Sequence, residues 1–404
     1  MQKKLLALAV AGALAPAAAM AQSTVEIYGR ANLGIDNWRA SGAAVSGNDF
    51  KSRNRIYDSG SRLGFRVNEA LGGGLRAFVV METGVNVDSG NNTAQSGLAN
   101  GSTGFWASRD SYLGLGGGWG DVRWGRQSIW WSNGVIAQTG ANYINTAVDG
   151  LTTGGLAISV PVTRQSNVLS YNSPTFGGFN ASLSYSPGAT EGATYTGQGA
   201  QEKDTVWGLT GRYTSGALRA QVDWAKRKNV GFISGQDYSG LKIGAGWAYA
   251  AGSQISFIHE RLENKNLQTA GSTATPGISQ LLTPGLAIAT AGQTAKQKVN
   301  LINWEHMLGQ WQLLAQYAWT GKLEGITTTD QTRTRGFTVA AKYFLSKRTG
   351  AYVSFTGIKN EDNAIGDLTG GGYSSTGASG SQGLPAASRG ADPRIMAIGV
   401  MHNF

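Results

Sequence analysis

The sequence predicts an all-β fold, a transmembrane antiparallel β-barrel of 16 strands, and three observations lead to it. Stretches of about ten residues alternate apolar with polar side chains from residue 24 onward, which is the two-residue period of strands. Short glycine-rich turns alternate with long polar segments between these stretches. The alternation also continues through residues 393–404, where chain ends usually lose regular structure.

The strand pattern is clearest in the segment WQLLAQYAWTGK. Trp311, Tyr317 and Trp319 share one parity, and Gln312 and Gln316 share the other. The segments expected to form strands are 24–37, 61–71, 75–87, 104–115, 120–129, 166–176, 178–188, 204–215, 217–228, 239–251, 253–265, 296–308, 310–322, 333–347, 349–360 and 393–404. A barrel of this size is wide enough to hold an aqueous channel.

The connections are sorted by length. Short turns such as residues 70–77 and 214–220 alternate with long polar segments. The long segments are 88–103, 188–203, 266–295 and 360–392. Short turns at one rim and long loops at the other are typical of outer-membrane barrels.

The last predicted strand explains how the barrel closes. Met396, Ile398, Val400 and Phe404 fall on one parity of residues 393–404. An open sheet edge in hydrocarbon would leave backbone groups without hydrogen bonds. We therefore expect residues 393–404 to pair with residues 24–37.

Residues 1–21 are expected to be a cleaved signal peptide, and residues 22–404 a single barrel domain. Lys3 and Lys4 precede an apolar run, and a small-x-small site ends at Ala21. This leader predicts export, and with the barrel it predicts a place in the outer membrane.

The composition excludes several classes of protein. Hydrophobic residues make up 41% of the chain, the mean hydropathy is −0.19, and no apolar run after Ala21 reaches the length of a membrane-spanning helix. The chain has no cysteine, which excludes disulfides and thiolate metal sites. The formal charge of +10 falls to +8 once Lys3 and Lys4 leave with the leader. Because these cations are spread along the strands, we expect attraction of small anions and no nucleic-acid binding.

No motif for catalysis, a metal or a cofactor is expected to function. The segment HERLE has Glu263 where the metal motif H-E-x-x-H requires a second histidine. The glycine runs join strands to strands, so they lack the helix of a phosphate-binding loop. The protein is expected not to be an enzyme; the remote alternative is a barrel hydrolase that uses Ser256 and His259.

With these stretches laid out, the chain resembles the general-diffusion porins of Gram-negative outer membranes, most closely the trimeric β-proteobacterial group. The resemblance covers residues 23–404 and is carried by STVEIYGRANLGI, SRLGFRVNEALGGGLRA, YLGLGGGWGDVRWGRQ, NVLSYNSPTFGGF, GAYVSFTGIKN and GVMHNF. It implies a homotrimer, a long third loop folded into the lumen and passive diffusion of small hydrophilic solutes. It also implies that Phe404 is an address for the barrel-assembly machinery, although His402 stands where an aromatic residue is more usual.

The resemblance also locates the pore constriction. The inserted loop would run from about residue 130 to 164, with Asp149 as its acidic residue. We expect the basic side of the constriction to consist of Arg30, Arg62, Arg66, Arg109 and Arg126, with Glu82 and Asp149 across from them. Of these residues, Arg126 is the one most strongly expected at the constriction. Arg123 has the opposite parity, so a regular strand cannot direct both side chains inward. A narrow charged ring would give anion preference; the alternative is that these arginines only form a solvated wall.

Other expectations concern partners and alternative functions. Tryptophan and tyrosine residues of apolar parity are expected in the interfacial girdles, among lipid and lipopolysaccharide, rather than in the lumen. Residues 88–103 are expected to latch onto a neighbouring subunit. The alternatives left open are a substrate-specific porin with a saturable solute site and an adhesin displayed on the long loops.

Overall fold

A computed structural model describes residues 24–43, 49–85, 87–88, 106–130, 162, 164–188, 204–230, 233–267, 289–364, 366 and 389–404. The strands are β1 (Thr24–Ser41), β2 (Phe50–Asp58), β3 (Arg62–Gly72), β4 (Leu75–Gly84), β5 (Ser111–Gly117), β6 (Gly120–Ser128), β7 (Arg164–Asn172), β8 (Phe179–Ser186), β9 (Thr205–Ser215), β10 (Leu218–Lys228), β11 (Tyr238–Ala250), β12 (Ser253–Asn264), β13 (Ala295–Leu308), β14 (Trp311–Thr320), β15 (Thr334–Phe344), β16 (Thr349–Asn360) and β17 (Asp392–Asn403). Within these ranges, no helix has the length and apolarity needed to cross a membrane.

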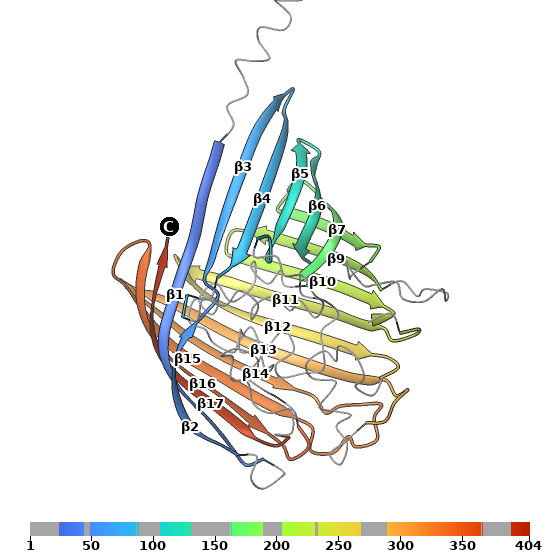
Figure 1. The fold of residues 1–404 in the computed structure, drawn as a ribbon, viewed down its shortest axis with the longest axis vertical. Helices are drawn as coiled ribbons and strands as arrows, with labels where there is room; N and C mark the ends of the chain where they lie inside the picture. Colours follow the sequence, from blue (N-terminus) through green and yellow to red (C-terminus); the bar gives the residue numbers. More distant parts are fainter. Residues whose placement is uncertain are drawn as a thin grey trace, which may run out of the picture.

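The strands form one closed antiparallel sheet. Strands from β3 to β17 pair with their neighbours in chain order, and β17 then pairs with β1 from Arg30↔Asn403 to Ser41↔Asp392. In Figure 1, the red β17 accordingly lies beside the blue β1. The predicted closure of the barrel by residues 393–404 is confirmed.

β2 and β3 together occupy one position of the barrel. β1 pairs with β3 through Thr24–Arg30 and with β2 from Leu33 to Ala40. β2 and β3 are both antiparallel to β1 and therefore lie end to end along it. The strand is interrupted between β2 and β3 at Gly60, which has φ +68°. Asn32 bridges the break, because its side-chain amide donates to the Ser59 carbonyl at 3.1 Å. The predicted 16-stranded barrel is therefore confirmed, although the sequence pattern did not reveal β2.

Other boundaries differ from the prediction at the ends next to the long loops. The stretch predicted as strand 104–115 pairs only from Ser111 onward, and the stretch predicted as 75–87 ends its pairing at Gly84. Beyond these points the two stretches stay joined by individual hydrogen bonds, such as that from the Arg109 N–H to the Glu82 carbonyl at 2.9 Å. Ser108 Oγ, for example, accepts a hydrogen bond from the Gly84 N–H at 3.0 Å.

The two faces of the sheet differ in chemistry, as the alternation predicted. Outward positions carry exposed apolar side chains such as Ile27, Leu209 and Ile398. Inward positions carry buried polar and charged side chains such as Gln316 and Lys342. A polar interior with an apolar exterior is the arrangement that a water-filled barrel in lipid requires.

From β9 through β17 to β2, the outer surface falls into two parts that differ in their aromatic residues. The outward faces of β9–β15 carry Trp207, Trp224, Trp247, Trp304, Trp311, Trp319, Tyr249, Tyr317 and Tyr343. The described outward positions of β16, β17, β1 and β2 carry no tryptophan or tyrosine, and Val353, Met396, Ile398, Ile35 and Ile56 are exposed there. We call this second surface the seam face. The predicted outward placement of the aromatic residues is confirmed for the first part of the wall.

Candidate pore constriction

Glu82 is the centre of a charged cluster on the inner wall. Its carboxylate accepts hydrogen bonds from Arg109 Nε and, at 3.2 Å, from the Tyr28 hydroxyl. Arg62 Nε lies 3.9 Å from the same carboxylate. Gly64 pairs with Tyr28 on one side and with Glu82 on the other. A Cβ at Gly64 would lie 2.6 Å from the Tyr28 hydroxyl oxygen, so the glycine leaves the space in which Tyr28 and Glu82 meet.

Asp110 is the second acidic residue of the cluster. It forms an ion pair with Arg164, whose Nε lies 2.6 Å from Oδ1, and it accepts a hydrogen bond from the Ser128 hydroxyl at 2.8 Å. Arg164 opens β7, and Asp110 directly precedes β5. The two residues are 54 positions apart in sequence, and the pairing of β5, β6 and β7 brings them together.

Arg126 joins the cluster because β6 is irregular. The register shifts between Gly125 and Gln127, and Gly125 has φ +142°. Arg126 Nε donates to the Ser108 carbonyl at 3.0 Å, and Nη1 donates to the Ser166 hydroxyl at 2.8 Å. A bulge of this kind re-aims a side chain.

We define the arginine cluster as Arg62, Arg109, Arg126 and Arg164 with Glu82 and Asp110. Its four guanidinium groups exceed its two carboxylates by two positive charges. Arg126 and Arg164 both lie near Arg109, so like charges repel within the cluster. Such a site offers an anion passing along the wall a favourable interaction that a cation does not find.

The chain leaving β6 crosses to the far part of the inner wall. Ile129 lies over Gly208 of β9, and the Trp130 ring lies over Gly240 of β11, where an added Cβ would come within 2.7 Å of it. Lys242 Nζ lies 4.6 Å from the Trp130 ring centroid and 3.2 Å from its carbonyl oxygen. The loop that begins at Trp130 therefore starts against the wall of β9–β11; residues 131–161 lie outside the described ranges.

Residues 7–363 match the family described as Gram-negative porin. The chain belongs to the Gram-negative porin family. It is 35% identical over 201 residues to a major outer membrane protein P.IB of Neisseria gonorrhoeae, which covers 48% of this chain and 50% of the relative. It is 30% identical over 278 residues to outer membrane porin protein 32 of Delftia acidovorans, with 64% and 70% covered. The chain spans about half the length of the Neisseria relatives that it matches.

Solved porin structures share the fold. The anion-selective porin from Comamonas acidovorans aligns with a TM-score of 0.67 and 21% identity over 95% of this chain and 100% of that chain. OmpF of Salmonella typhi aligns with a TM-score of 0.57 and 15% identity over 94% and 97%. This porin is accordingly an outer-membrane β-barrel.

The arginines expected at the constriction of this porin lie at different places on the wall. Arg62, Arg109 and Arg126 belong to the arginine cluster. Arg30 is buried on the inner face of β1, where its Nη2 donates to the Gly60 carbonyl at 3.0 Å. Arg66 is half exposed; it pairs with Glu26 at 3.4 Å and stacks over the Tyr28 ring at 3.9 Å.

The acidic residues require one correction. Glu82 was expected across the pore from the arginines, but it lies among them, because β4 pairs directly with β3 and carries Glu82 to the level of Arg62 and Arg109. Asp149 lies outside the described residues, and so does the loop that was expected to fold into the lumen.

Two members of the cluster were missed from the sequence. Arg164 was assigned to the end of the loop, and Asp110 was not among the residues expected at the constriction. Their signal was that each lies where a strand begins after a long connection, Asp110 before β5 and Arg164 at the start of β7. Arg123, which was ranked below Arg126, also faces inward; it makes two hydrogen bonds to Asp121, at 2.6 and 3.1 Å.

A polar recess of about 330 Å³ lies beside the cluster on the inner wall of β6–β9. Arg123, Asn172, Asn180, Ser182 and Arg212 are among the residues that line it. It contains the two arginines and several neutral donors, which is a suitable environment for a small anionic solute.

The remote hydrolase alternative is contradicted by the strand geometry. Ser256 is buried on the inner face of β12, whereas His259 has outward parity and its Nδ1 donates to Asn300 Oδ1 at 2.8 Å. Residues three apart on a strand point to opposite faces. The two side chains therefore cannot form a catalytic pair.

Proposed function

We propose that this porin forms a water-filled channel for passive diffusion of small hydrophilic solutes and ions, with a preference for anions. The observation that carries the proposal is the arginine cluster, which concentrates two excess positive charges on one inner wall. The anion-selective porin from Comamonas acidovorans, which has the same fold, supports it.

Electrostatics explains why the position of these charges matters more than the total charge. Two unit charges 4 Å apart interact by about 1 kcal/mol in water and by about 4 kcal/mol at an effective dielectric near 20. The +10 formal charge is spread over the whole chain, including outward-facing and loop positions. Only charges within a few ångströms of the permeating ion distinguish anions from cations strongly.

Planar-bilayer recordings test the proposal. The refolded protein in a salt gradient should show discrete conductance steps and a reversal potential of the sign given by anion preference. Arg126→Ala should lower the anion-to-cation permeability ratio by up to about fivefold, the factor for about 1 kcal/mol. Cation preference of the unmodified protein would overturn the proposal, and so would the absence of conductance steps.

We further propose a homotrimer that assembles through the seam face. The aromatic residues of β9–β15 have the distribution of a lipid-facing wall, in which rings lie at the interfaces of the bilayer. The seam face offers aliphatic side chains such as Ile35, Ile56 and Ile398 instead. Ile56→Arg should convert trimers to monomers in native mass spectrometry, whereas Leu209→Arg on β9 should leave trimers intact; the opposite pattern would reject the assignment. The 88–103 latch lies outside the described residues and remains a prediction.

The expected cellular partners follow from this placement. The barrel lies among outer-membrane lipid and lipopolysaccharide, and Phe404 would be the contact for the barrel-assembly machinery. The chain has no enzymatic role in this proposal, and it needs no cofactor or metal.

The polar recess favours one alternative, a substrate-specific porin with a saturable site. Arg123 and Arg212 would hold the anionic group of the solute there. Liposome uptake measured against solute concentration distinguishes the two cases. Uptake through a general channel rises linearly, and uptake through a specific channel saturates and loses saturation in Arg212→Ala.

A further inference from the structure

Cations gather on the outer surface of the barrel where strands β10–β13 approach the long loops. Arg261 of β12 and Lys296 and Lys298 of β13 have outward parity and are exposed. Positions closer to the short turns on the same faces are apolar, for example Phe257 and Ile302. The cations therefore lie at the border between the apolar band and the loop rim.

Arg261 and Lys298 are direct register partners on neighbouring strands. Side chains in such a pair approach within about 5.5 Å at Cβ, and like charges placed directly opposite destabilise the sheet. No carboxylate pairs with either side chain within the described residues; Arg261 Nε instead donates to His259 Nε2 at 3.3 Å. An anion placed between the two cations would remove their repulsion.

Of the two acidic residues nearby, Glu263 pairs with other cations and Glu324 forms no ion pair with a described residue. Glu263 pairs with both Lys265 and Lys296, each at 3.2 Å. Glu324 also lines the region and has no ion pair with a described residue. Arg261 and Lys298 thus remain as the two cations that an external anion can use.

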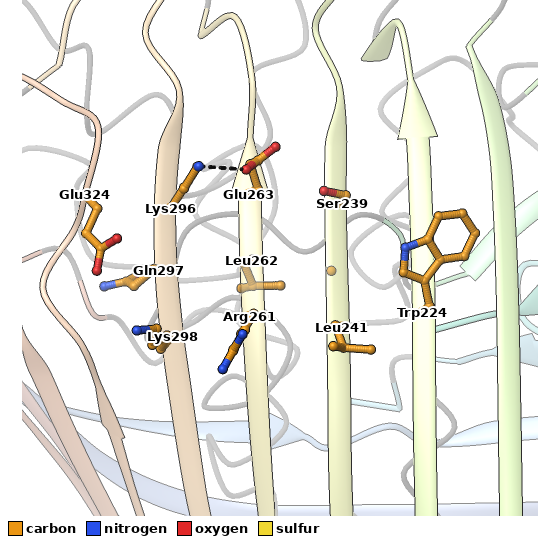
Figure 2. A pocket seen from close by; sticks show the side chains of 11 residues that line it. Trp224, Ser239, Leu241, Arg261, Leu262, Glu263, Lys296, Gln297, Lys298 and Glu324 are labelled. Carbon is orange, nitrogen blue, oxygen red and sulfur yellow. Dashed lines mark ion pairs between the residues drawn. The ribbon is translucent and has the colours of Figure 1, made fainter.

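A groove of about 390 Å³ passes over these side chains (Figure 2). In Figure 2, Trp224, Leu241, Arg261 and Lys298 lie on four adjacent strands, and the register Trp224↔Leu241↔Arg261↔Lys298 places them in one row. The groove therefore has an apolar half, formed by the indole and the leucine, and a cationic half, formed by the arginine and the lysine.

We propose that this groove binds a phosphate group of the lipopolysaccharide in the outer leaflet, with Arg261 and Lys298 as its ligands. The long-loop rim of such barrels faces the outside of the cell, which places the groove at the headgroup level of that leaflet. The apolar half would accept the beginning of an acyl chain, and Arg261 would bind phosphate through two parallel N–H donors. A soluble phosphate would use only the cationic half. The inference rests on the proposed function, because it requires that this wall face lipid.

The test compares four purified proteins in detergent: the unmodified porin, Arg261→Gln, the double variant Arg261→Gln/Lys298→Gln, and Lys322→Gln/Lys359→Gln. The last removes the same two charges from lysines paired with Asp330 and Asp392. Each is titrated with bisphosphorylated lipid A, dephosphorylated lipid A, phosphatidylglycerol and inorganic phosphate, with adducts measured by native mass spectrometry. Bilayer conductance is recorded for each preparation.

We expect the double variant to bind bisphosphorylated lipid A about thirtyfold more weakly, since each cation contributes about 1 kcal/mol. The paired-lysine control should bind within about threefold of the unmodified porin. All four should conduct alike, because Arg261, Lys298 and Lys359 face outward and Lys322 is paired with Asp330 in the connection after β14. The proposal is overturned by equal binding of dephosphorylated lipid A, by full displacement with inorganic phosphate, by a preference for phosphatidylglycerol, or by unchanged affinity in the double variant. If the unmodified porin shows no conductance, that result would instead refute the proposed function.

Discussion

The ammonium group of Lys242 lies 4.6 Å from the centroid of the Trp130 ring and forms an ion pair with Glu260 at 3.2 Å. All three side chains are at least 98% buried. Lys242 also donates to the Trp130 carbonyl at 3.2 Å. One inward-facing cation of β11 therefore holds the start of the long loop and neutralises a buried carboxylate of β12.

Removing that cation should destabilise the barrel. In Lys242→Met the Glu260 carboxylate would be buried without its partner, which typically costs about 3–5 kcal/mol. Urea unfolding in detergent micelles, followed by tryptophan fluorescence, measures the free energy of unfolding. In the double variant Lys242→Met/Glu260→Gln most of this loss should be absent, because no charge remains buried. Equal losses in the single and double variants would show that the ion pair does not matter.

Neutralising the central carboxylate of the arginine cluster should strengthen anion preference. Glu82→Gln removes the charge that Arg62 and Arg109 now share. The permeability ratio should rise by up to about fivefold, the factor for about 1 kcal/mol. Arg335→Gln changes an exposed, outward-facing charge on β15 and is the control. Reversal potentials that shift by equal amounts in opposite directions in the two variants would assign selectivity to the overall charge instead.

The sequence predicted the architecture well because alternation and loop length are local properties. The closure through residues 393–404 and the inward parity of Arg30, Arg62 and Arg66 follow from the two-residue period. The cluster was only partly predictable, since a bulge at Gly125 sets the direction of Arg126 and strand pairing brings Arg164 to Asp110. The break at Gly60 also escaped detection, because β2 carries several charged residues and lacks a regular alternation.

Salt should separate the contributions of exposed and buried charges. The Debye length falls from about 10 Å at 0.1 M salt to about 3 Å at 1 M. Arg66 and Glu26 are more than half exposed, whereas Arg109 and Glu82 are largely buried. Anion preference measured by reversal potential should therefore decrease at 1 M salt but persist. Its complete loss at 1 M would place the selecting charges in the exposed vestibule.

The last prediction concerns Phe404 and Gly29, which meet where the two ends of the sheet pair. Phe404 and Gly29 exchange backbone hydrogen bonds of 3.0 and 3.1 Å, and the Phe404 ring occupies the position that a Gly29 Cβ would take. Gly29→Val should therefore displace the ring and destabilise the folded barrel by about 1–3 kcal/mol, a typical cost of overpacking. Gly211→Val on β9 is the matched control, because no atom lies within 4 Å of the corresponding Cβ position. The measurement is the folded fraction against urea, read from the heat-modifiable mobility of the barrel in gels. A Cβ at Gly29 would also lie 2.7 Å from the Arg62 carbonyl oxygen, so removing the ring should relieve only part of the loss. Gly29→Val should therefore cost less in the Phe404→Ala background than in the unmodified protein; an equal cost in both backgrounds would show that the ring does not rest on Gly29.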